Sequence, residues 1–352
     1  MLDDIESINK IDKSGILDDF ERFPEQINES KEIVEKTDLG RLYKIDNIVV
    51  TGVGVSAIAG DLLQSFLRGK LKIPVFVNRQ YDLPKWTNKN TLIFSVSYSG
   101  DTEETLNAFQ HAYQKKCKII GISAGGRLKE FCEKRNLPHI NIPSGLRPRT
   151  ALGYLLFSMI FSLQKVGLLR LKIKSDIKEA IEKSKWVRED NNKNIPIEKN
   201  LAKKTAKMID NTIPQIYGWG VYTPVARRWA NQFNENSKLI SRYDEIPECN
   251  HNDIVAWSLN PEFSKNFSCI LIRDEKNESV YMSERLKFMK KLFKDNTSNV
   301  IEIEVKGKKK LARMIYAMYL GDFVSCYLGL LRKKDPSSIN IIEELKERLS
   351  KL

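Results

Sequence analysis

The stretch Thr91-Leu-Ile-Phe-Ser-Val-Ser97-Tyr-Ser99-Gly100-Asp-Thr102-Glu-Glu-Thr-Leu106 decides the class of fold. Its apolar run, residues 92–96, predicts a buried strand, and Gly100 permits a tight turn after it. A threonine followed by two glutamates then predicts the start of a helix. Three hydroxyl groups therefore gather where a strand passes into a helix, those of Ser97, Ser99 and Thr102. Hydroxyls and unpaired backbone N–H groups at such a place suit an anion, above all phosphate; the alternative is that they only cap the helix and the turn.

A similar strand, turn and helix pattern occurs earlier, in residues 47–63, around Gly52-Val-Gly54-Val-Ser56-Ala57. This glycine spacing has the form of a dinucleotide-binding fingerprint. Such sites use an acid at the end of the second strand to bind ribose, and Asn78 and Arg79 occupy that position here. NAD is therefore poorly supported, and NADP is a weak alternative. The same turn, with Gly54 and Ser56, can serve any anion or sugar hydroxyl, or it is simply a tight turn.

Strands alternate with helices up to residue 142, which predicts a parallel sheet covered on both faces. The opening pattern returns in residues 213–233, so we predict two similar α/β halves, each a parallel sheet flanked by helices. Later strands are expected at 254–257, 268–272 and 300–305, and later helices at 284–293, 311–331 and 338–349. The expected organisation is an N-terminal subdomain over 1–165, a helical connection over 166–195 and a C-terminal subdomain over 196–352.

The composition is that of a soluble globular protein: 352 residues, 41% hydrophobic and 29% charged. No stretch approaches the ~18 apolar residues that span a bilayer, and the acidic N-terminus lacks a signal core, so we predict a cytoplasmic protein with no membrane contact. Five cysteines without a paired spacing predict reduced, buried thiols and no metal site. The net charge of +13 is spread along the chain and mixed with acids, which favours a charged surface over nucleic-acid binding.

Two charged residues stand at helix ends where the helix dipole disfavours their charge. Arg149 begins the apolar helix predicted over 150–168, where a cation faces the positive end of the helix dipole. A bound anion would account for it; the alternative is an arginine that points into solvent. Glu235 ends its helix, where the negative end of the dipole favours the protonated carboxyl and suits a general base. The alternative for Glu235 is a salt bridge to Lys238.

Two further residues are candidates for proton transfer. His251 lies in a polar loop before the strand predicted at 254–257, and a structural role is as well supported as a catalytic one. Lys346 occupies an apolar position in the helical stripe that Ile339, Ile342 and Leu349 define. It either extends its charged end to solvent or reaches into a pocket, where burial would favour the neutral amine.

Together these motifs resemble those of the sugar isomerase (SIS) fold family, and most closely the bifunctional phosphoglucose/phosphomannose isomerases of archaea and bacteria. The resemblance covers most of the chain and rests on residues 52–61, 97–105, 148–154, 234–238, 250–252, 321–322 and 335–346. It departs from the family pattern at Val55, where a second glycine is usual, and at Ser337, where the family often has threonine. The resemblance implies two flavodoxin-like subdomains, in agreement with the repeated half.

The resemblance also implies a reaction: reversible aldose–ketose isomerisation of glucose 6-phosphate, and of mannose 6-phosphate, to fructose 6-phosphate. The turn at Ser97, Ser99 and Thr102 would hold the phosphate, Glu235 would move the proton between C1 and C2, and Arg149 would stabilise the enediolate. The roles implied for two more residues concern opening of the sugar ring: His251, supplied by the partner subunit of a homodimer, and Lys346. No metal and no nucleotide cofactor is implied.

Two alternatives to the isomerase stay open at this level. One is an amino-sugar phosphate synthase, which usually carries an N-terminal glutaminase with a nucleophilic cysteine, whereas the first cysteine here is Cys117. The other is a sugar-phosphate sensor that binds without catalysis. Sensors of this fold usually carry a helix-turn-helix segment, and residues 1–40 contain no basic recognition helix.

Overall fold

The computed structural model describes residues 1–169 and 173–349, which form two compact units. The N-terminal-sheet unit comprises Arg22–Glu182 and Lys308–Ala312. The C-terminal-sheet unit comprises Met1–Glu21, Lys183–Gly307 and Arg313–Leu352. The first 21 residues are thus grouped with the second sheet, a difference from the subdomain boundaries expected above. Each unit is described by itself below.

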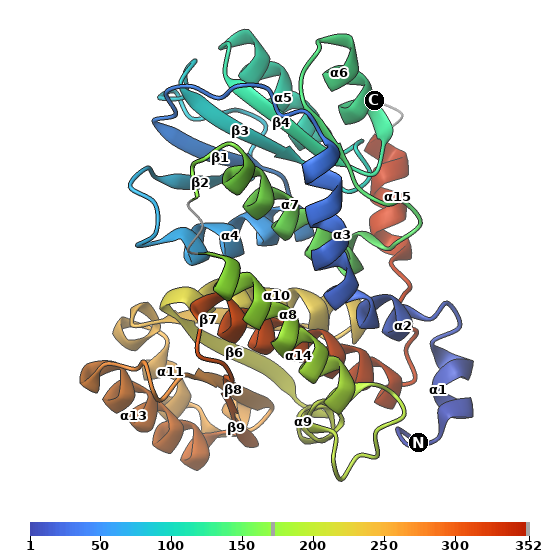
Figure 1. Ribbon diagram of the computed structural model, residues 1–352. Coiled ribbons are helices and arrows are strands. Elements are labelled where there is room, and N and C mark those ends of the chain that lie inside the picture. The colour runs from blue at the N-terminus through green and yellow to red at the C-terminus, as the bar shows by residue number, and fades with distance from the viewer. Residues whose placement is uncertain (170–172, 350–352) are drawn as a thin grey trace. The chain divides into compact units, whose positions relative to one another are not determined.

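The N-terminal-sheet unit contains five parallel strands in the order β2-β1-β3-β4-β5. They are β1 (Asn47–Thr51), β2 (Val75–Asn78), β3 (Thr91–Val96), β4 (Lys118–Ser123) and β5 (His139–Asn141), and Figure 1 shows them fanned across this unit. Every residue of β3 is buried, as expected of a central strand with helices on both faces. The strand order is that of flavodoxin-like folds, so the predicted fold class is confirmed.

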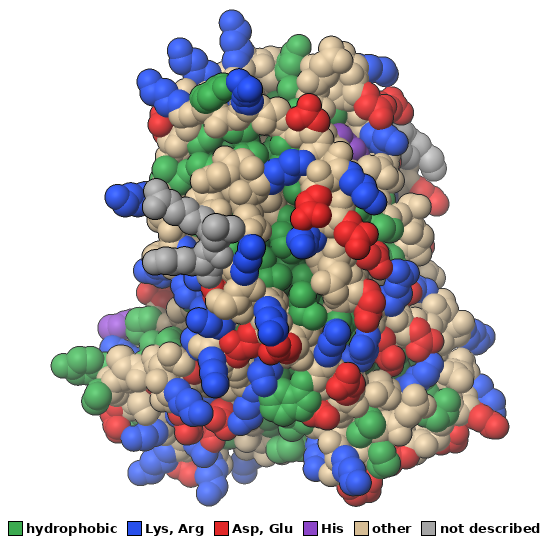
Figure 2. Space-filling model, in the orientation of Figure 1, with side chains coloured by type: hydrophobic (Ala, Val, Ile, Leu, Met, Phe, Trp, Pro, Cys, Tyr) green, Lys and Arg blue, Asp and Glu red, His purple; other side chains and the backbone are tan. Residues whose placement is uncertain are grey.

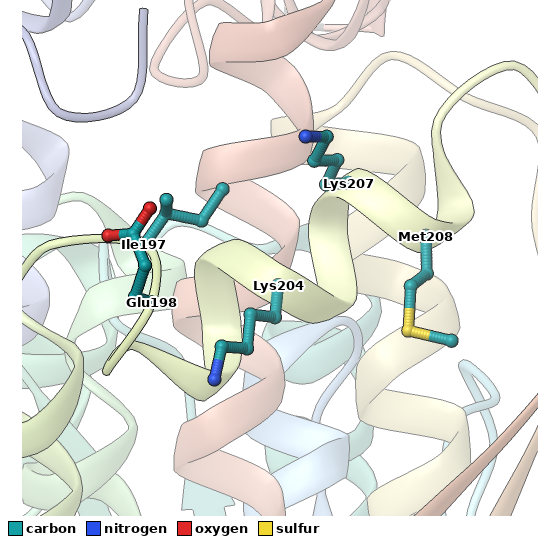
Figure 3. A pocket seen from close by; sticks show the side chains of 5 residues that line it. All are labelled: Ile197, Glu198, Lys204, Lys207 and Met208. Atoms are coloured by element: carbon teal, nitrogen blue, oxygen red, sulfur yellow. The ribbon is translucent and has the colours of Figure 1, made fainter.

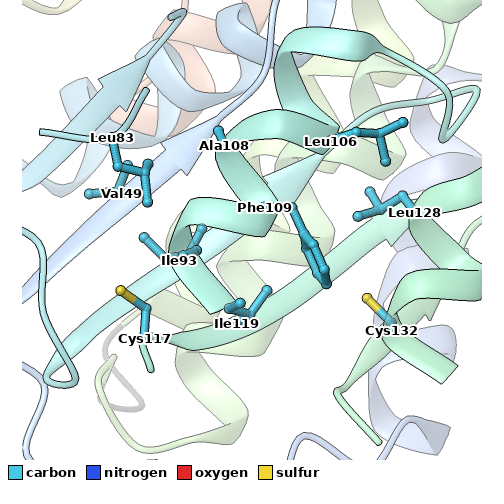
Figure 4. Packing of buried hydrophobic residues seen from close by; sticks show 11 residues of the cluster. Val49, Leu83, Ile93, Leu106, Ala108, Phe109, Cys117, Ile119, Leu128 and Cys132 are labelled. Carbon is cyan, nitrogen blue, oxygen red and sulfur yellow. The ribbon is translucent and has the colours of Figure 1, made fainter. Parts of the chain in front are cut away.

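Helices cover both faces of this sheet. They are α3 (Phe23–Lys36), α4 (Val55–Leu67), α5 (Glu103–Gln114), α6 (Gly126–Lys134) and α7 (Leu152–Lys165). The next helix along the chain, α8 (Lys174–Asn191), begins in this unit and ends in the other. On one face, the side chains of β1, β3 and β4 pack against Phe109 of α5 and Leu128 of α6 (Figure 4). On the opposite face, Gly60 of α4 lies so close to Val50 that an added Cβ would stand 3.0 Å from it. The helix start predicted at Thr102 and the helix predicted over 150–168 are confirmed.

The C-terminal-sheet unit contains four parallel strands in the order β7-β6-β8-β9. They are β6 (Ile213–Trp219), β7 (Arg242–Ile246), β8 (Phe267–Arg273) and β9 (Asn299–Glu304). Its helices are α1 (Ile5–Ile11), α2 (Ile16–Glu21), α9 (Leu201–Ile209), α10 (Thr223–Asn236), α11 (Ile254–Leu259), α12 (Pro261–Ser264), α13 (Val280–Asn296), α14 (Lys310–Leu331) and α15 (Asn340–Leu349). Both sheets place their first strand between the second and the third, which confirms the predicted repeat.

The prediction of a strand at 254–257 is wrong, because these residues form helix α11. An apolar run of four residues fits a strand and a helix turn equally well, and here Trp257 packs into a core that includes Phe293 of α13. The true strand of this region, β7, escaped detection because it is an edge strand whose residues are mostly polar and only partly buried.

Helix α14 corrects the expectation that no stretch is apolar enough to span a bilayer. Its 22 residues contain an 18-residue window with a mean hydropathy of 1.4. However, 94% of that window is buried within the protein, as is typical of the core helix of a globular protein.

The five cysteines are buried free thiols, as predicted. On the face in Figure 2, Lys and Arg side chains are interspersed with Asp and Glu, which agrees with the predicted mixed-charge surface.

Candidate active site

The site begins at the switch point of the N-terminal sheet, where the chain leaves β1 toward one edge and β3 toward the other. The loops after these two neighbouring strands lie at the same edge, the usual position of ligands in such sheets. Gly52 lies in the first loop, and a Cβ there would stand 2.7 Å from the carbonyl oxygen of Val96 and 2.8 Å from the Cβ of Ser56. Only glycine permits this close approach of the two loops.

The first loop presents Gly54 and Ser56 at the start of α4. Gly54 has a φ of +57°, a backbone conformation that favours glycine, and it stands at the N-cap of the helix. Ser56 lies in the first turn of α4 and is buried. Val55 opens the helix, so the departure from the family glycine falls on a residue with ordinary helical geometry. The sequence prediction that Gly54 and Ser56 bind the substrate stays a prediction.

The second loop, residues 97–102, which we call the serine turn, brings the three predicted hydroxyls together. The Oγ of Ser97 lies 2.8 Å from the Oγ1 of Thr102 and 3.5 Å from the Oγ of Ser99. Thr102 occupies the N-cap position of α5 but makes no side-chain capping bond. The hydroxyls therefore face one another, and the view that they merely cap the helix loses its support for Thr102. This arrangement, at a helix N-terminus, suits a phosphate group.

The serine turn is held rigidly by the loop between β4 and α6 and by the first turn of α6. Gly100, with a φ of +80°, packs so tightly that an added Cβ would stand 1.9 Å from the carbonyl oxygen of Gly125. The N–H of Leu128 donates to the carbonyl of Gly100 at 2.9 Å, and the N–H of Arg127 donates to the Oδ1 of Asp101 at 3.0 Å. The turn is therefore preorganised before any ligand binds.

His139 supports this loop from β5. Its Nε2 lies 2.8 Å from the Oγ of Ser123, which in turn donates to the carbonyl of Gly125 at 2.7 Å. Burial, with a smaller contribution from Lys129, lowers the pKa of His139 to about 4. The ring is therefore neutral near pH 7, and it serves the structure of the loop.

Arg149 lies in a short 3-10 helix, Pro148–Thr150, immediately before α7. Only 3% of its surface is exposed, so the alternative of an arginine pointing into solvent is wrong. The segment is held from the side of α3, because the Nε2 of Gln26 donates to the carbonyl of Thr150 at 2.7 Å. A buried guanidinium near a helix N-terminus is unfavourable unless negative groups face it.

Glu235 lies in the last turn of α10 and is half-buried. One face of this helix carries Arg228 and Gln232, whose side chains donate to the Oδ1 of the buried Asp322 at 3.0 and 2.8 Å. Burial raises the pKa of Asp322, and the charge of Glu235 adds to that shift, so the two carboxylates are near neighbours. The Nζ of Lys238 donates to the backbone carbonyl of Glu235 at 2.5 Å.

His251 ends a short 3-10 helix, Glu248–His251, and its side chain is exposed. The loop around it is anchored in the core by Asp253, which accepts hydrogen bonds from the hydroxyl of Tyr217 at 2.6 Å and the Nε1 of Trp257 at 2.7 Å. The neighbouring Asn250 accepts from the Nη1 of Arg285 at 3.1 Å. An exposed histidine on a firmly held loop is available to a ligand or to another chain.

Lys346 lies on α15, a helix without buried residues in its described range. The predicted stripe is therefore exposed, with Ile342 at 37% and Leu349 at 42%, and Lys346 does not enter a pocket of its own unit. The segment before α15 is connected to the end of α10, since the Nζ of Lys238 also donates to the carbonyl of Pro336 at 3.2 Å. Ser337 is bonded internally, donating to the Oδ1 of Asp335 at 2.7 Å.

The corresponding switch point of the C-terminal sheet, between β6 and β8, is occupied by the protein's own charges. After β8, Asp274 is buried and contacts the hydroxyl of Tyr222 at 2.5 Å and the Nε of Arg313 at 2.9 Å. Arg273 forms paired bonds to Glu278 at 2.9 Å. These ion pairs engage the charged side chains at this switch point with one another. Sequence reasoning missed this network, because its members are far apart along the chain.

An open pocket on the surface of α9 does not qualify as a catalytic site. It is lined by Ile197, Glu198, Lys204, Lys207 and Met208. Figure 3 shows that the two lysines point in different directions, so their charges do not converge on one ligand.

Arg79 forms an ion pair with the partly buried Asp61, which weakens the NADP alternative. Among the described residues, no group of His, Cys, Asp and Glu has the arrangement of a metal site.

Comparison with known proteins follows the same division of the chain. Residues 41–132 match the SIS domain family, and residues 198–349 match the family described as the bacterial phospho-glucose isomerase C-terminal SIS domain. A relative from Caldicellulosiruptor bescii, named bifunctional phosphoglucose/phosphomannose isomerase, is 40% identical over 94% of this chain and 97% of its own. The chain belongs to the bifunctional phosphoglucose/phosphomannose isomerase family. A relative of the same name from Thermoplasma acidophilum is 34% identical over 93% of this chain and 97% of its own.

Solved structures agree on the fold of this family member. A hypothetical protein from Thermus thermophilus matches with a TM-score of 0.75 and 14% identity, over 98% of this chain and 93% of that chain. The C-terminal domain of a glucosamine-fructose-6-phosphate aminotransferase from Francisella tularensis matches with a TM-score of 0.67 and 15% identity, over 91% and 97%. At this level of identity the likeness concerns the SIS fold alone.

Proposed function

We propose that this protein interconverts glucose 6-phosphate and mannose 6-phosphate with fructose 6-phosphate. The observation that carries the proposal is the convergence of three hydroxyls in a rigid turn at the switch point of the sheet, in a chain 40% identical to a bifunctional isomerase. A dianionic phosphate is the ligand that best fits hydroxyl donors at a helix N-terminus. The serine turn would hold the 6-phosphate and so position the other end of the sugar.

Glu235 is proposed as the base. It removes the proton from C2 of the open-chain aldose, while the C1 carbonyl takes up the electron pair as an enediolate. The same carboxyl then returns the proton to C1, and a hydroxyl proton moves to leave a ketone at C2. Arg149 is proposed to stabilise the negative oxygen of the enediolate, because a guanidinium presents several N–H donors to an oxyanion. No oxidant or reductant is consumed.

The same intermediate accounts for the proposed action on both sugars. Glucose and mannose 6-phosphates differ only in configuration at C2, and C2 becomes planar in the enediolate. A base that reaches C2 from either configuration therefore delivers one common intermediate. Lys238, which bonds both the end of α10 and the carbonyl of Pro336, connects the proposed base to the segment that contains Ser337.

Ring opening is proposed for His251 and Lys346. Both side chains are exposed, so they can exchange protons with a ring oxygen and a C1 hydroxyl. A second copy of the chain is proposed to supply His251 across a dimer interface. The support is an apolar surface near this histidine: α11 packs against α13, and both expose large side chains, Val255, Leu259, Val280, Tyr281 and Phe288, at 58 to 84%. Exposed apolar surface of this kind marks an interaction site.

One assay tests the proposal as a whole. Glucose 6-phosphate and mannose 6-phosphate are supplied separately, and formation of fructose 6-phosphate is followed with a coupled dehydrogenase. Turnover of both sugars supports the bifunctional isomerase, for which we propose a place in glycolysis or gluconeogenesis in the cytoplasm. Binding without turnover supports the sensor, and consumption of fructose 6-phosphate only with an added nitrogen donor supports the amino-sugar synthase; either result overturns the proposal.

A further inference from the structure

Tyr98 stands between the two serines of the serine turn, and its side chain serves a different purpose from theirs. It is buried, since only 8% of its surface is exposed. Its hydroxyl donates to the carbonyl of Pro143 at 3.2 Å and accepts from the N–H of Leu146 at 2.8 Å. One hydroxyl thus binds two backbone groups of the loop that follows β5.

This loop leads directly to the proposed enediolate-stabilising arginine. Residues 143–147 have no regular secondary structure, and the 3-10 helix that contains Arg149 follows at once. The loop is fixed at its start, where the N–H of Ile142 donates to the carbonyl of Ser123 at 3.0 Å, and beyond its end, where Gln26 donates to the carbonyl of Thr150 at 2.7 Å. Tyr98 holds the middle of the loop to the serine turn.

We propose that Tyr98 is a positioning residue that sets the distance between the serine turn and Arg149; this inference rests on the proposed function. The serine turn fixes one end of the sugar phosphate, and Arg149 must meet the oxygen that becomes negative several atoms away. A misplacement of about 1 Å at such a group can reduce the rate by roughly 100-fold. Because Tyr98 belongs to the serine turn and its hydroxyl bonds the loop that leads to Arg149, it transmits the position of the turn to that loop.

Tyr98→Phe is the informative variant, because it keeps the buried ring and removes only the hydroxyl. We expect kcat to fall roughly 10- to 100-fold while KM changes less than about threefold. Inhibition by inorganic phosphate should stay unchanged, because the bonds within the serine turn do not use the tyrosine hydroxyl. Tyr113→Phe, a change at a half-exposed tyrosine of α5, is the matched control and should leave both constants unchanged.

A double-mutant cycle with Arg149→Ala separates positioning from simple packing. If Tyr98 acts through Arg149, Tyr98→Phe should change kcat less than about twofold in the Arg149→Ala background. Multiplicative losses would overturn the inference, as would an unchanged kcat in Tyr98→Phe, or a drop in kcat with an equal loss of phosphate inhibition and a lower Tm. A wild-type protein without isomerase activity would overturn the proposed function itself, and this inference with it.

Discussion

Single residues carry the proposed chemistry, and their surroundings give each a different task. Glu235 ends a helix, half-buried, beside the buried carboxylate of Asp322. The proposed base thus stands at the negative end of a helix dipole and next to another acidic side chain. Ser97 and its neighbours, by contrast, offer neutral donors that bind an anion without changing their own charge.

Glu235→Gln keeps the size of the side chain and removes its ability to take up a proton. We expect the fold to persist and kcat to fall by about 10²–10⁴ with both sugar phosphates, since this is the usual contribution of a general base. Steady-state rates of fructose 6-phosphate formation and a thermal melt provide the measurement. Turnover within tenfold of the wild type would show that another group moves the proton.

The double variant Ser97→Ala and Ser99→Ala removes two of the three hydroxyls of the serine turn. Hydrogen bonds to a charged group contribute about 1.5–3 kcal/mol each, so KM for sugar phosphates should rise at least about tenfold. Competitive inhibition by inorganic phosphate should weaken in parallel. Ser162→Ala is the control, because that buried hydroxyl in α7 bonds only to the carbonyl of Ser158 among the contacts described. An unchanged KM in the double variant would remove the phosphate assignment.

Contacts between neighbouring helices hold the proposed catalytic residues in place, and those between α10 and α14 position Glu235. Helices α10 and α14 meet so closely that a Cβ on Gly321 would stand 2.2 Å from the indole of Trp229. Besides the pair of Arg228 and Asp322, the Nδ2 of Asn236 donates to the hydroxyl of Ser325 at 2.9 Å. These contacts between α10 and α14, which we call the seam, determine the direction in which the last turn of α10 points.

Asp322→Ala should destabilise the seam, because it leaves the guanidinium of Arg228 buried without its carboxylate. Breaking a buried pair in this way costs about 3–5 kcal/mol, a decrease in Tm of roughly 10 °C. The double variant Arg228→Met with Asp322→Leu removes both charges and should recover most of that loss. Differential scanning calorimetry of the three proteins decides the matter; a loss below about 1 kcal/mol in the single variant would contradict the assigned role.

The strand β5 contributes a pH-dependent term through His139, whose pKa burial lowers to about 4 from an ordinary value of 6.5. Between these values the unfolded chain binds a proton that the folded protein does not, so this contribution to stability is lost as the pH falls from 6.5 toward 4. Wild-type Tm should fall between pH 7 and pH 4.5, and His139→Gln should make this fall smaller. The difference should correspond to about 1–2 kcal/mol in the free energy of unfolding, after allowance for the part of the ring that solvent reaches. An identical decrease in Tm in the wild type and the variant would refute this role of His139. His111→Gln serves as the control.

At the scale of the whole molecule, the proposed dimer makes each site depend on two chains. Glu235→Gln and His251→Ala subunits are inactive by themselves in this scheme. When they are unfolded together and refolded as a mixture, half of the chains should form mixed dimers. Each mixed dimer contains one site with Glu235 from one chain and His251 from the other.

The mixture should therefore recover about one quarter of the wild-type activity per chain, whereas each variant refolded alone should stay inactive. Light scattering during size-exclusion chromatography confirms the dimer in every sample. Recovery in the mixture cannot occur if His251 serves its own chain, because no chain then holds both residues. A monomer, or a mixture as inactive as its parts, would contradict the shared site.

Local pattern alone was sufficient for much of this protein. The buried strand that leads into Ser97, the glycines that follow β1, and the repeat at residues 213–233 all depend on apolar periodicity and on backbone freedom, which neighbours along the chain decide. The convergence of Ser97, Ser99 and Thr102 was equally predictable, because five residues separate the first from the last and a tight turn folds them together.

Only the tertiary structure decided the features that depend on distant partners. Residues 254–257 became a helix because Trp257 packs beside α13, and β7 became a strand because β6 offered it backbone partners despite its polar side chains. The burial of Arg149, the exposure of Lys346 and the ion pairs that fill the second switch point arise from contacts between segments far apart in the sequence. Periodicity reports which face of an element is apolar, whereas burial and pairing are properties of the surface that the rest of the chain brings against it.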